Sequence, residues 1–294
     1  MKSFTLNHES FHEVKAGRRG AAVLVNEDKT KYLRIGEPAV LGRELAFHQE
    51  LLKLGFPVAP ILDSGAIDGH EYSVEASLGA EHFSVLFAAD LAASGHIEPA
   101  TFAKYLAIVE QFRTAQVKTE RAATPEGWAT FLDALHVSTL KAELPDFANQ
   151  IDAAVTKATA ELAATPFCLT HGDLTTHNIL PGGVIDFGDH FTGPTGYDLV
   201  TALSVPFWIP RSELNFEYHK LYNFTDAEVT SFLNHLGPIP NFDALFFLKS
   251  IWWDVKNHPA PKLQAWRHHL FRQVTTRYLS NESLFSFYLD HKDD

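Results

Sequence analysis

The sequence predicts an α+β fold with a small β-rich N-terminal lobe and a larger, mainly helical C-terminal lobe. Three observations support this prediction. Short apolar runs with strand propensity gather before residue 77. Apolar positions at helical spacing dominate from residue 83 onward. A polar segment flanked by strand-like residues interrupts the helices between residues 167 and 187. We expect the smaller lobe at residues 1–77 and the larger lobe at residues 78–294.

Composition restricts the classes of function. The chain has 294 residues, enough for two coupled lobes, and its formal net charge of -12 argues against a nucleic-acid partner. Its single cysteine, Cys168, permits no intrachain disulfide. The N-terminus has no apolar signal region, and no apolar run has the length needed to cross a bilayer. The expectation is a cytoplasmic protein without a membrane partner.

Within the N-terminal lobe, residues 21–25 and 31–35 are strand candidates joined by turn residues, which predicts a hairpin. Residues 40–54 place apolar side chains at helical spacing, and Gly55 ends that helix. Residues 72–76 form a further strand candidate.

The C-terminal lobe is expected to be built from long helices around a short strand-containing insert. The strand-like residues of that insert are 167–170 and 184–187. The helix candidates are residues 83–94, 99–117, 126–140, 145–163, 197–207, 225–236, 241–257 and 260–280.

The densest motif lies in the insert. His171, Asp173 and Asn178 follow the spacing H-x-D-x-x-x-x-N, and Asp186 opens an Asp-Phe-Gly sequence. Asp173 can accept the proton of a substrate hydroxyl. Asn178 and Asp186 provide an amide and a carboxylate oxygen, which suit magnesium bound also to phosphates and water. Each residue alone is more typical of a turn or a cap, but their joint spacing favours phosphoryl transfer.

With Gly172 after the histidine and Asp198-Leu199 downstream, this segment resembles the aminoglycoside phosphotransferase family, small-molecule kinases that share the protein-kinase fold. The resemblance implies a protein-kinase-like two-lobe fold, ATP and magnesium as cofactors, and a small hydroxylated acceptor. Residues 1–77 would then be the nucleotide-binding lobe, and residues 78–294 would carry the catalytic loop and the acceptor-binding helices. It implies that His171 holds the loop geometry and that Asp198 braces the loop by accepting backbone N–H groups. The family includes aminoglycoside, macrolide, choline, homoserine and sugar kinases, and the sequence does not choose among them.

The nucleotide-binding residues are less clearly marked. Gly17 and Gly20 keep two glycines of a phosphate-binding loop, where a glycine lets backbone N–H groups approach a phosphate. A turn with basic flanks explains the same residues equally well. The strand that contains Glu75 is expected to run past the adenine.

Arg34 lies on the second strand candidate, where the resemblance leads us to expect a phosphate-holding lysine. Arginine keeps the charge and can bind a phosphate through two hydrogen bonds, and Lys31 is the alternative cation. Glu44, at the start of the following helix, is the natural ion-pair partner of Arg34.

The acceptor-binding residues are the hardest to identify. Asp189 lies near the metal-binding loop, and Trp208, Trp253 and Asp254 can form an aromatic and acidic pocket for an amine. Aromatic residues on helices belong more often to the core. The net charge of -12 also favours a cationic acceptor, because it concentrates cations near the protein.

Two other functions remain open from the sequence. The first is a metal-dependent hydrolase, because histidine and carboxylate side chains cluster between residues 171 and 190. The second is a nucleotide-binding protein without catalysis, because the glycine loop is incomplete and arginine replaces the usual lysine. The clustered residues are His171, Asp173, His177, Asp186, Asp189 and His190.

Overall fold

The computed structural model describes residues 3–15, 21–208, 224–255 and 261–291. The chain divides into two compact units, which we describe separately. Unit 1 comprises Met1–Leu86, Ile97–Ala115 and His177–Asp186, and unit 2 comprises Phe87–His96, Gln116–Thr176 and Phe187–Asp294. Unit 1 thus extends past residue 77 and takes in two later segments. The lobe boundary at residues 77 and 78 stays a prediction.

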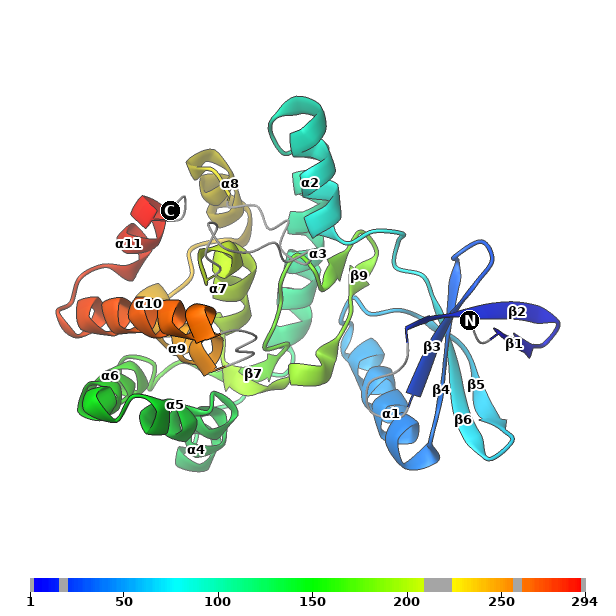
Figure 1. Ribbon diagram of the computed structural model, residues 1–294, viewed down its shortest axis with the longest axis horizontal. Coiled ribbons are helices and arrows are strands. Elements are labelled where there is room, and N and C mark those ends of the chain that lie inside the picture. Colours follow the sequence, from blue (N-terminus) through cyan, green and yellow to red (C-terminus); the bar gives the residue numbers. More distant parts are fainter. Residues whose placement is uncertain (1–2, 16–20, 209–223, 256–260, 292–294) are drawn as a thin grey trace. The chain divides into compact units, whose positions relative to one another are not determined.

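Unit 1 is built on a six-stranded antiparallel sheet with the strand order β1-β2-β3-β4-β6-β5 (Figure 1). Helix α1 (Pro38–Leu54) packs against β4 and β6, and Pro38 occupies a first-turn position where its missing N–H costs nothing. The strands are β1 (Ser3–Leu6), β2 (Glu9–Lys15), β3 (Ala21–Asn26), β4 (Lys31–Gly36), β5 (Ile61–Ile67) and β6 (His70–Ala76).

The sheet buries one apolar cluster, because alternate residues of a strand point to the same face. Its buried members are Leu6, Phe11, Leu24, Leu33 and Val74. These come from five different strands, so the cluster fixes the register of the sheet.

Two further elements complete unit 1. Helix α3 (Pro99–Val117) belongs to unit 1 as far as Ala115 and packs its aromatic side chains against other parts of that unit. The Tyr105 ring lies edge-on to Phe83 at 5.4 Å, and the Phe112 ring lies edge-on to Phe56 at 5.2 Å. The second element is a short hairpin of β8 (Ile179–Leu180) and β9 (Gly183–Val184).

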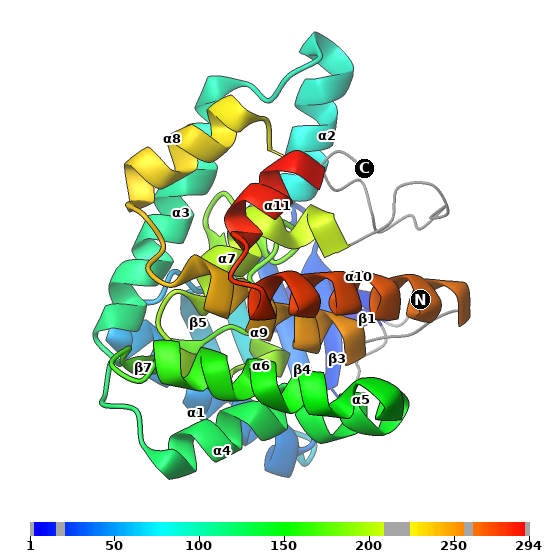
Figure 2. The same cartoon turned by 90° about the vertical axis from the view of Figure 1, so that its left-hand side faces the viewer.

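Unit 2 is mainly helical, and α9 (Phe242–Val255) is its central helix (Figure 2). Helices α6, α7, α10 and α11 all pack against α9, which explains why its sequence is apolar on nearly every side. These four helices span Ala148–Glu161, Tyr197–Ser204, Pro261–Leu279 and Leu284–His291. Helices α4 (Pro125–Ala134), α5 (Val137–Glu143) and α8 (Asp226–Leu236), and the 3-10 helices η2 (Pro145–Phe147), η3 (Phe187–Asp189) and η4 (Val205–Trp208), complete the unit.

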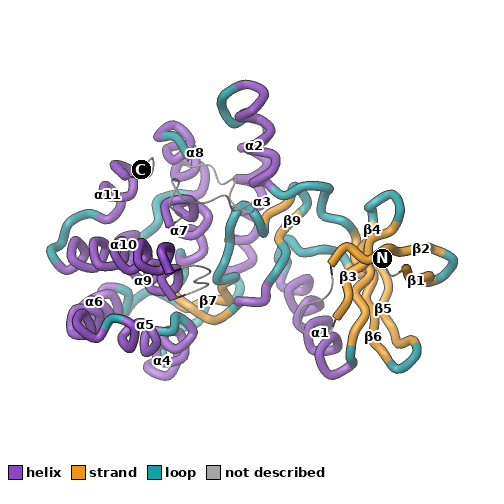
Figure 3. The backbone as a smooth tube through the Cα atoms, viewed as in Figure 1, coloured by secondary structure: helices purple, strands orange, loops and turns teal. Residues whose placement is uncertain are grey.

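One pair of strands lies within unit 2. Strand β7 (Phe167–Thr170) pairs antiparallel with β10 (Phe191–Pro194), and Thr170 lies opposite Phe191. The two strands therefore hold the ends of the motif segment close together. Figure 3 shows the contrast between the strands gathered at the N-terminal end and the helices that follow.

The structure confirms the α+β fold class and several of the expected helices. Helix α2 (Phe83–Ser94) and α3 have the expected bounds. The single helix predicted for 126–140 is wrong, because His136 adopts a left-handed conformation with φ 59° and separates α4 from α5. Strands β1 and β2 and helix α11 were not predicted. Among the described residues, no helix has the length and apolar character needed to cross a membrane.

Candidate active site

The loop that carries Asp173 follows β7 in unit 2 and is held by a buried carboxylate. Asp198, in the first turn of α7, accepts the backbone N–H of His171 at 2.8 Å through Oδ2 and that of Gly172 at 3.1 Å through Oδ1. Gln116 donates to the same Oδ2 at 2.7 Å and to the Leu169 carbonyl at 2.9 Å. This is the bracing geometry that the family resemblance implies for Asp198, with Gln116 as an additional partner that the sequence did not reveal.

Asp198 is almost completely buried, with 1% of its surface exposed. Burial raises the pKa of its carboxyl, while charge and hydrogen-bond contributions from His171, Lys249 and Gly172 oppose that rise. A buried carboxylate is stable only when it is paired or hydrogen-bonded. The partners of Asp198 therefore stabilise its buried charge, and the same hydrogen bonds fix the backbone of the loop.

Glycine is required at position 172 for steric reasons. Gly172 has φ +79°, and a Cβ atom there would lie 2.4 Å from the Asp189 carbonyl oxygen and 2.9 Å from the Phe191 ring. An L-residue with a side chain would be strained by its backbone and would clash with its neighbours. This explains why the motif has glycine between His171 and Asp173.

A buried lysine also contacts this loop. Lys249 on α9 is 0% exposed, and its Nζ donates to the Gly172 carbonyl at 2.6 Å. The same ammonium lies 3.7 Å from the centre of the Trp252 ring and 5.0 Å from that of Tyr197. Lys249 is a functional residue that the motif does not include, although a lone lysine inside the apolar stretch Phe-Phe-Leu-Lys-Ser-Ile-Trp-Trp is a signal.

His171 orients the loop. Its Nδ1 accepts the backbone N–H of Asp173 at 3.2 Å, so the proton of the neutral ring lies on Nε2. The ring is fully buried and packs 4.6 Å from Phe187. These contacts agree with a structural function for His171, and the Asp173 side chain remains partly exposed.

In unit 1, the β8–β9 hairpin brings Asn178 and Asp186 to the same end. The N–H of Ile185 donates to the Asn178 carbonyl at 2.9 Å, and Asp186 follows directly. The Val184 N–H anchors the hairpin to the Pro57 carbonyl at 2.6 Å. Asp186 has φ 61°, a strained conformation for a non-glycine residue and one often found at functional sites. An amide and an exposed carboxylate at one hairpin end fit a magnesium ion that also binds phosphates.

The cationic group of unit 1 is organised around Arg34. Its guanidinium forms an ion pair with Glu44 of α1, as the sequence suggested, and its Nη1 lies 3.8 Å from the Glu75 carboxylate. His48 Nδ1 is 3.7 Å from the same Glu75 oxygen. The arginine side chain is 28% exposed, so it is both positioned by two carboxylates and accessible.

Lys31 has a different environment. It forms a 2.7 Å ion pair with Glu9 of β2, and it lies three residues from Arg34 on the same strand. Residues three apart on a strand point to opposite faces, so Lys31 does not join the Arg34 group. The predicted glycine-loop residues Gly17 and Gly20 lie outside the described residues.

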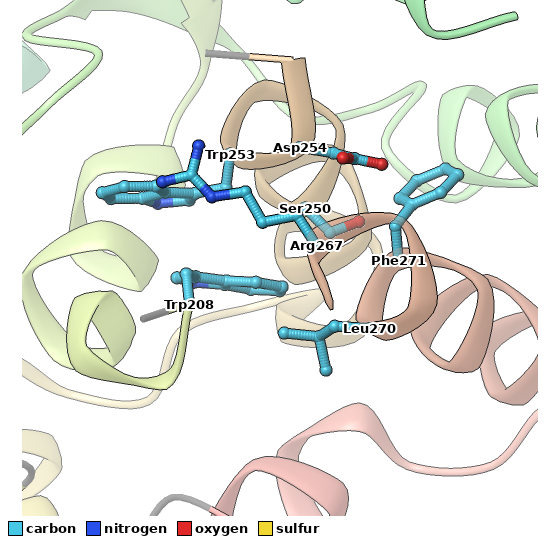
Figure 4. Close-up of a pocket in the computed structure, with 7 residues that line it drawn as sticks. All are labelled: Trp208, Ser250, Trp253, Asp254, Arg267, Leu270 and Phe271. Carbon is cyan, nitrogen blue, oxygen red and sulfur yellow. The ribbon is translucent and has the colours of Figure 1, made fainter. Parts of the chain in front are cut away.

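Three of the four acceptor candidates meet in one pocket of unit 2, and Asp189 is exposed and not part of it (Figure 4). Burial raises the pKa of Asp254 to about 6, although a hydrogen bond from His268 opposes the rise, and burial lowers the pKa of Arg267 to about 10. The lining residues are Trp208, Ser250, Trp253, Asp254, Arg267, Leu270 and Phe271.

The histidines proposed for a hydrolase metal site have other partners. In unit 1, His177 Nδ1 lies 2.9 Å from the Ser84 hydroxyl, and its ring is edge-on to His82. In unit 2, His190 Nδ1 is 2.6 Å from the Phe187 carbonyl. Within the described ranges, no three His, Cys, Asp or Glu side chains are grouped so as to hold a metal ion. The geometry gives the hydrolase alternative no support.

An antiparallel N-terminal sheet, a mainly helical remainder and a braced Asp173 loop define a phosphotransferase of the protein-kinase-like class. The chain belongs to the phosphotransferase enzyme family (APH), whose model matches residues 10–227. The comparison with curated protein sequences gives no match.

Solved structures support the same fold at low sequence identity. Aminoglycoside phosphotransferase APH(3'')-Id from Streptomyces rimosus, in complex with ADP and streptomycin, has 16% identity and a TM-score of 0.51 over 83% of this chain and 91% of that one. The amicoumacin kinase hAmiN, in complex with AMP-PNP, Ca²⁺ and Ami, has 13% identity and a TM-score of 0.54 over 94% and 91%. A choline/ethanolamine kinase family protein from Mesorhizobium loti has 17% identity and a TM-score of 0.53 over 96% and 92%.

Proposed function

We propose that this phosphotransferase is an ATP- and magnesium-dependent kinase that phosphorylates a hydroxyl group of a small molecule. The observation that carries the proposal is the braced loop of unit 2. Asp198 and Lys249 fix the backbone of His171 and Gly172 through buried hydrogen bonds, and this backbone leads directly to Asp173. A general base must lie within hydrogen-bond reach of the proton that it accepts, and a backbone fixed in this way can hold Asp173 in such a position.

Asp173 is the proposed base. It accepts the proton of the acceptor hydroxyl while that oxygen forms its bond to the γ-phosphorus of ATP and the bond to ADP breaks. His171 keeps the loop in position, and its hydrogen bond to the Asp173 backbone leaves the carboxylate to the substrate. These assignments give individual residues of this chain roles in the phosphotransferase reaction of the family.

Asn178 and Asp186 are the proposed magnesium ligands, and Arg34 is the proposed phosphate contact. Bound magnesium would neutralise charge on the transferred phosphates. Arg34 is held by Glu44 and Glu75, which orient its guanidinium without burying it. ADP and AMP-PNP in the complexes of the structural neighbours are consistent with a nucleotide donor.

The test is a coupled assay of ADP release with magnesium–ATP and a panel of aminoglycosides, amino alcohols, sugars and hydroxy acids. The expected result is ADP release that depends on one class of acceptor, with a phosphorylated product of the same amount found by mass spectrometry. ADP release that is independent of every acceptor would contradict the proposal. Thermal stabilisation by magnesium–ATP without any turnover would instead favour an inert nucleotide-binding protein.

A further inference from the structure

The pocket lined by Trp208, Trp253 and Arg267 lies close to the catalytic loop within unit 2. Lys249 connects the two. Its Nζ donates to the Gly172 carbonyl at 2.6 Å, and the same atom lies 5.7 Å from the centre of the Trp253 ring. Two side chains, Trp253 and Lys249, therefore lie between a group bound in this pocket and the loop that carries the proposed base. The free volume inside the pocket is about 10 Å³, room for about one water-sized group, and part of the pocket is open to solvent.

The features that would attract a cation are already used by the chain itself. The Arg267 guanidinium lies against the Trp253 ring, 5.6 Å from its centre, with Trp208 below it in Figure 4. The Asp254 carboxylate accepts hydrogen bonds from His268 Nδ1 at 2.8 and 3.0 Å. A substrate ammonium would have to displace Arg267 from the aromatic face and would meet its positive charge.

Two residues that line the pocket instead carry donors that lack acceptors. The indole Nε1 atoms of Trp208 and Trp253 are buried, and neither has a hydrogen-bond partner among the described residues. An indole N–H can only donate, and a buried donor without a partner is unfavourable. Trp208 is 2% exposed and Arg267 is 8% exposed, so water reaches either side chain poorly.

We infer that this pocket binds an anionic group of the acceptor, and that the acceptor is a hydroxylated carboxylate rather than a hydroxylated amine. A carboxylate offers several acceptor positions, which match two indole N–H groups and the fork of a guanidinium. The inference rests on the proposed kinase function, because it assigns the pocket to the acceptor. It reverses the cationic preference suggested by the net charge and by Asp254.

The experiment compares acceptors that differ in one group only. Gluconate, gluconamide and glucamine form one set, and glycerate, glyceramide and aminopropanediol form another. Phosphorylation is measured by ADP release with magnesium–ATP, and binding is measured separately by calorimetry without nucleotide. The carboxylate of at least one set is expected to bind and to show the lowest KM, while the matching amine is the poorest member.

The matched variants remove the indole N–H and keep a six-membered aromatic ring. Trp208→Phe and Trp253→Phe are each expected to raise the KM or the dissociation constant of the carboxylate by roughly ten-fold, the worth of a hydrogen bond to a charged group. The KM for ATP should not change. Trp128→Phe is the control, because Trp128 lies on α4 and is not part of the pocket.

The outcomes separate the inference from the proposed function. If the parent binds a carboxylate that Trp208→Phe does not bind, but the parent does not phosphorylate it, the pocket assignment is supported and the kinase proposal is weakened. Turnover with equal or better use of the amines would support the kinase proposal and overturn the inference. Failure of every carboxylate to bind, or equal binding by Trp208→Phe and the parent, would also overturn it.

Discussion

The charged group around Arg34 in unit 1 and the charged group around Asp198 in unit 2 are built in opposite ways. Arg34, Glu44 and Glu75 keep between 13% and 32% of their side-chain surface exposed. Asp198 and Lys249 keep 1% or less of theirs. The difference indicates two purposes: the accessible charges can still contact a ligand, while the buried charges set the shape of the backbone.

The two groups should also differ in how much they contribute to the free energy of unfolding. Partly exposed ion pairs contribute little to stability, typically below about 1 kcal/mol, because water screens them. A buried charge that loses its partner costs about 3–5 kcal/mol, because nothing replaces the lost interaction. Substitutions in unit 1 are therefore expected to change function more than stability, and those at the braced loop to change both.

The largest expected effect is at Asp173, whose loop is held by Asp198 and Lys249. Asp173→Asn should reduce turnover by about two to four orders of magnitude, because the amide cannot accept the hydroxyl proton. The midpoint of thermal unfolding and the affinity for magnesium–ATP should stay close to those of the parent. Turnover within a few-fold of the parent would show that Asp173 is not the base. The hydrogen bonds of Asp198 and Lys249 to the loop would then not serve to position it.

The second prediction concerns the hairpin end in unit 1. Asp186→Ala should abolish the magnesium-dependent part of nucleotide binding, because the metal links this carboxylate to the phosphates. Asn178→Ala should weaken it less, since an amide carries no formal charge. Calorimetry with ATP in magnesium and in EDTA measures that part directly. Equal affinity of Asp186→Ala and the parent in magnesium would rule out the metal role.

The third prediction compares a buried lysine with an exposed one. Lys249→Met should lower the free energy of unfolding by about 2 kcal/mol, since it removes a charged hydrogen bond to the Gly172 carbonyl and contacts with Trp252. Turnover should fall because Gly172 loses its support. Lys31→Met is the matched control, because the Lys31–Glu9 pair is more than 30% exposed on both sides. Urea unfolding curves of equal midpoint for the two variants would abolish the proposed contrast.

These two groups also show what the sequence can and cannot predict. His171, Asp173 and Asn178 were identified because their roles depend on spacing within one short segment. Lys249 and Gln116 were missed because each contacts the loop from a helix more than 50 residues away along the chain, and no local pattern encodes such a contact.

The secondary structure shows the same difference between features that local sequence marks and features that depend on distant contacts. Helices α2 and α3 were predicted with their bounds because Gly95 follows the end of one and Pro99 begins the other, and both are standard helix stop and start signals. The break at His136 was missed because neither glycine nor proline marks it. Strand β2 was missed because its sequence, Glu-Ser-Phe-His-Glu-Val-Lys, contains few apolar residues, and its pairing with β1 and β3 supplies the stability that its composition does not show.

The fourth prediction tests whether the Arg34 group serves phosphate binding. Arg34→Ala should raise the KM for magnesium–ATP or lower turnover by roughly ten-fold, the worth of a charge-assisted hydrogen bond, while stability changes by less than about 1 kcal/mol. Arg34→Lys should retain much of the activity because the charge remains. Glu9→Gln is a control that removes the charge from the Lys31 pair on the other face of β4, while the glutamine oxygen can still accept the hydrogen bond from Asn26. A loss of stability without a kinetic effect would show that Arg34 is structural.

The smallest expected effect uses Cys168, which lies on β7 three residues before His171 and is completely buried. Burial raises the pKa of its thiol to about 12, against an ordinary value of 9.0. The folded state therefore favours the protonated thiol. This contribution to stability is fully present below about pH 9 and is lost only as the pH rises toward 12. Since the thiolate is the reactive form, a disulfide reagent at pH 8 should label the native protein at least about 100-fold more slowly than the urea-unfolded protein.

The labelling rate at pH 8 then measures how often the strand beside the catalytic loop opens. In Lys249→Met the rate should increase in step with the loss of stability, because weaker support of Gly172 makes opening more frequent. In Arg34→Ala it should stay at the parent value, because that residue belongs to unit 1. All five tryptophans lie in unit 2, so their fluorescence provides an independent measure of its unfolding in the same samples. Rapid labelling of the native parent, or equal acceleration in both variants, would show that the buried group does not make this loop more rigid than the sheet of unit 1.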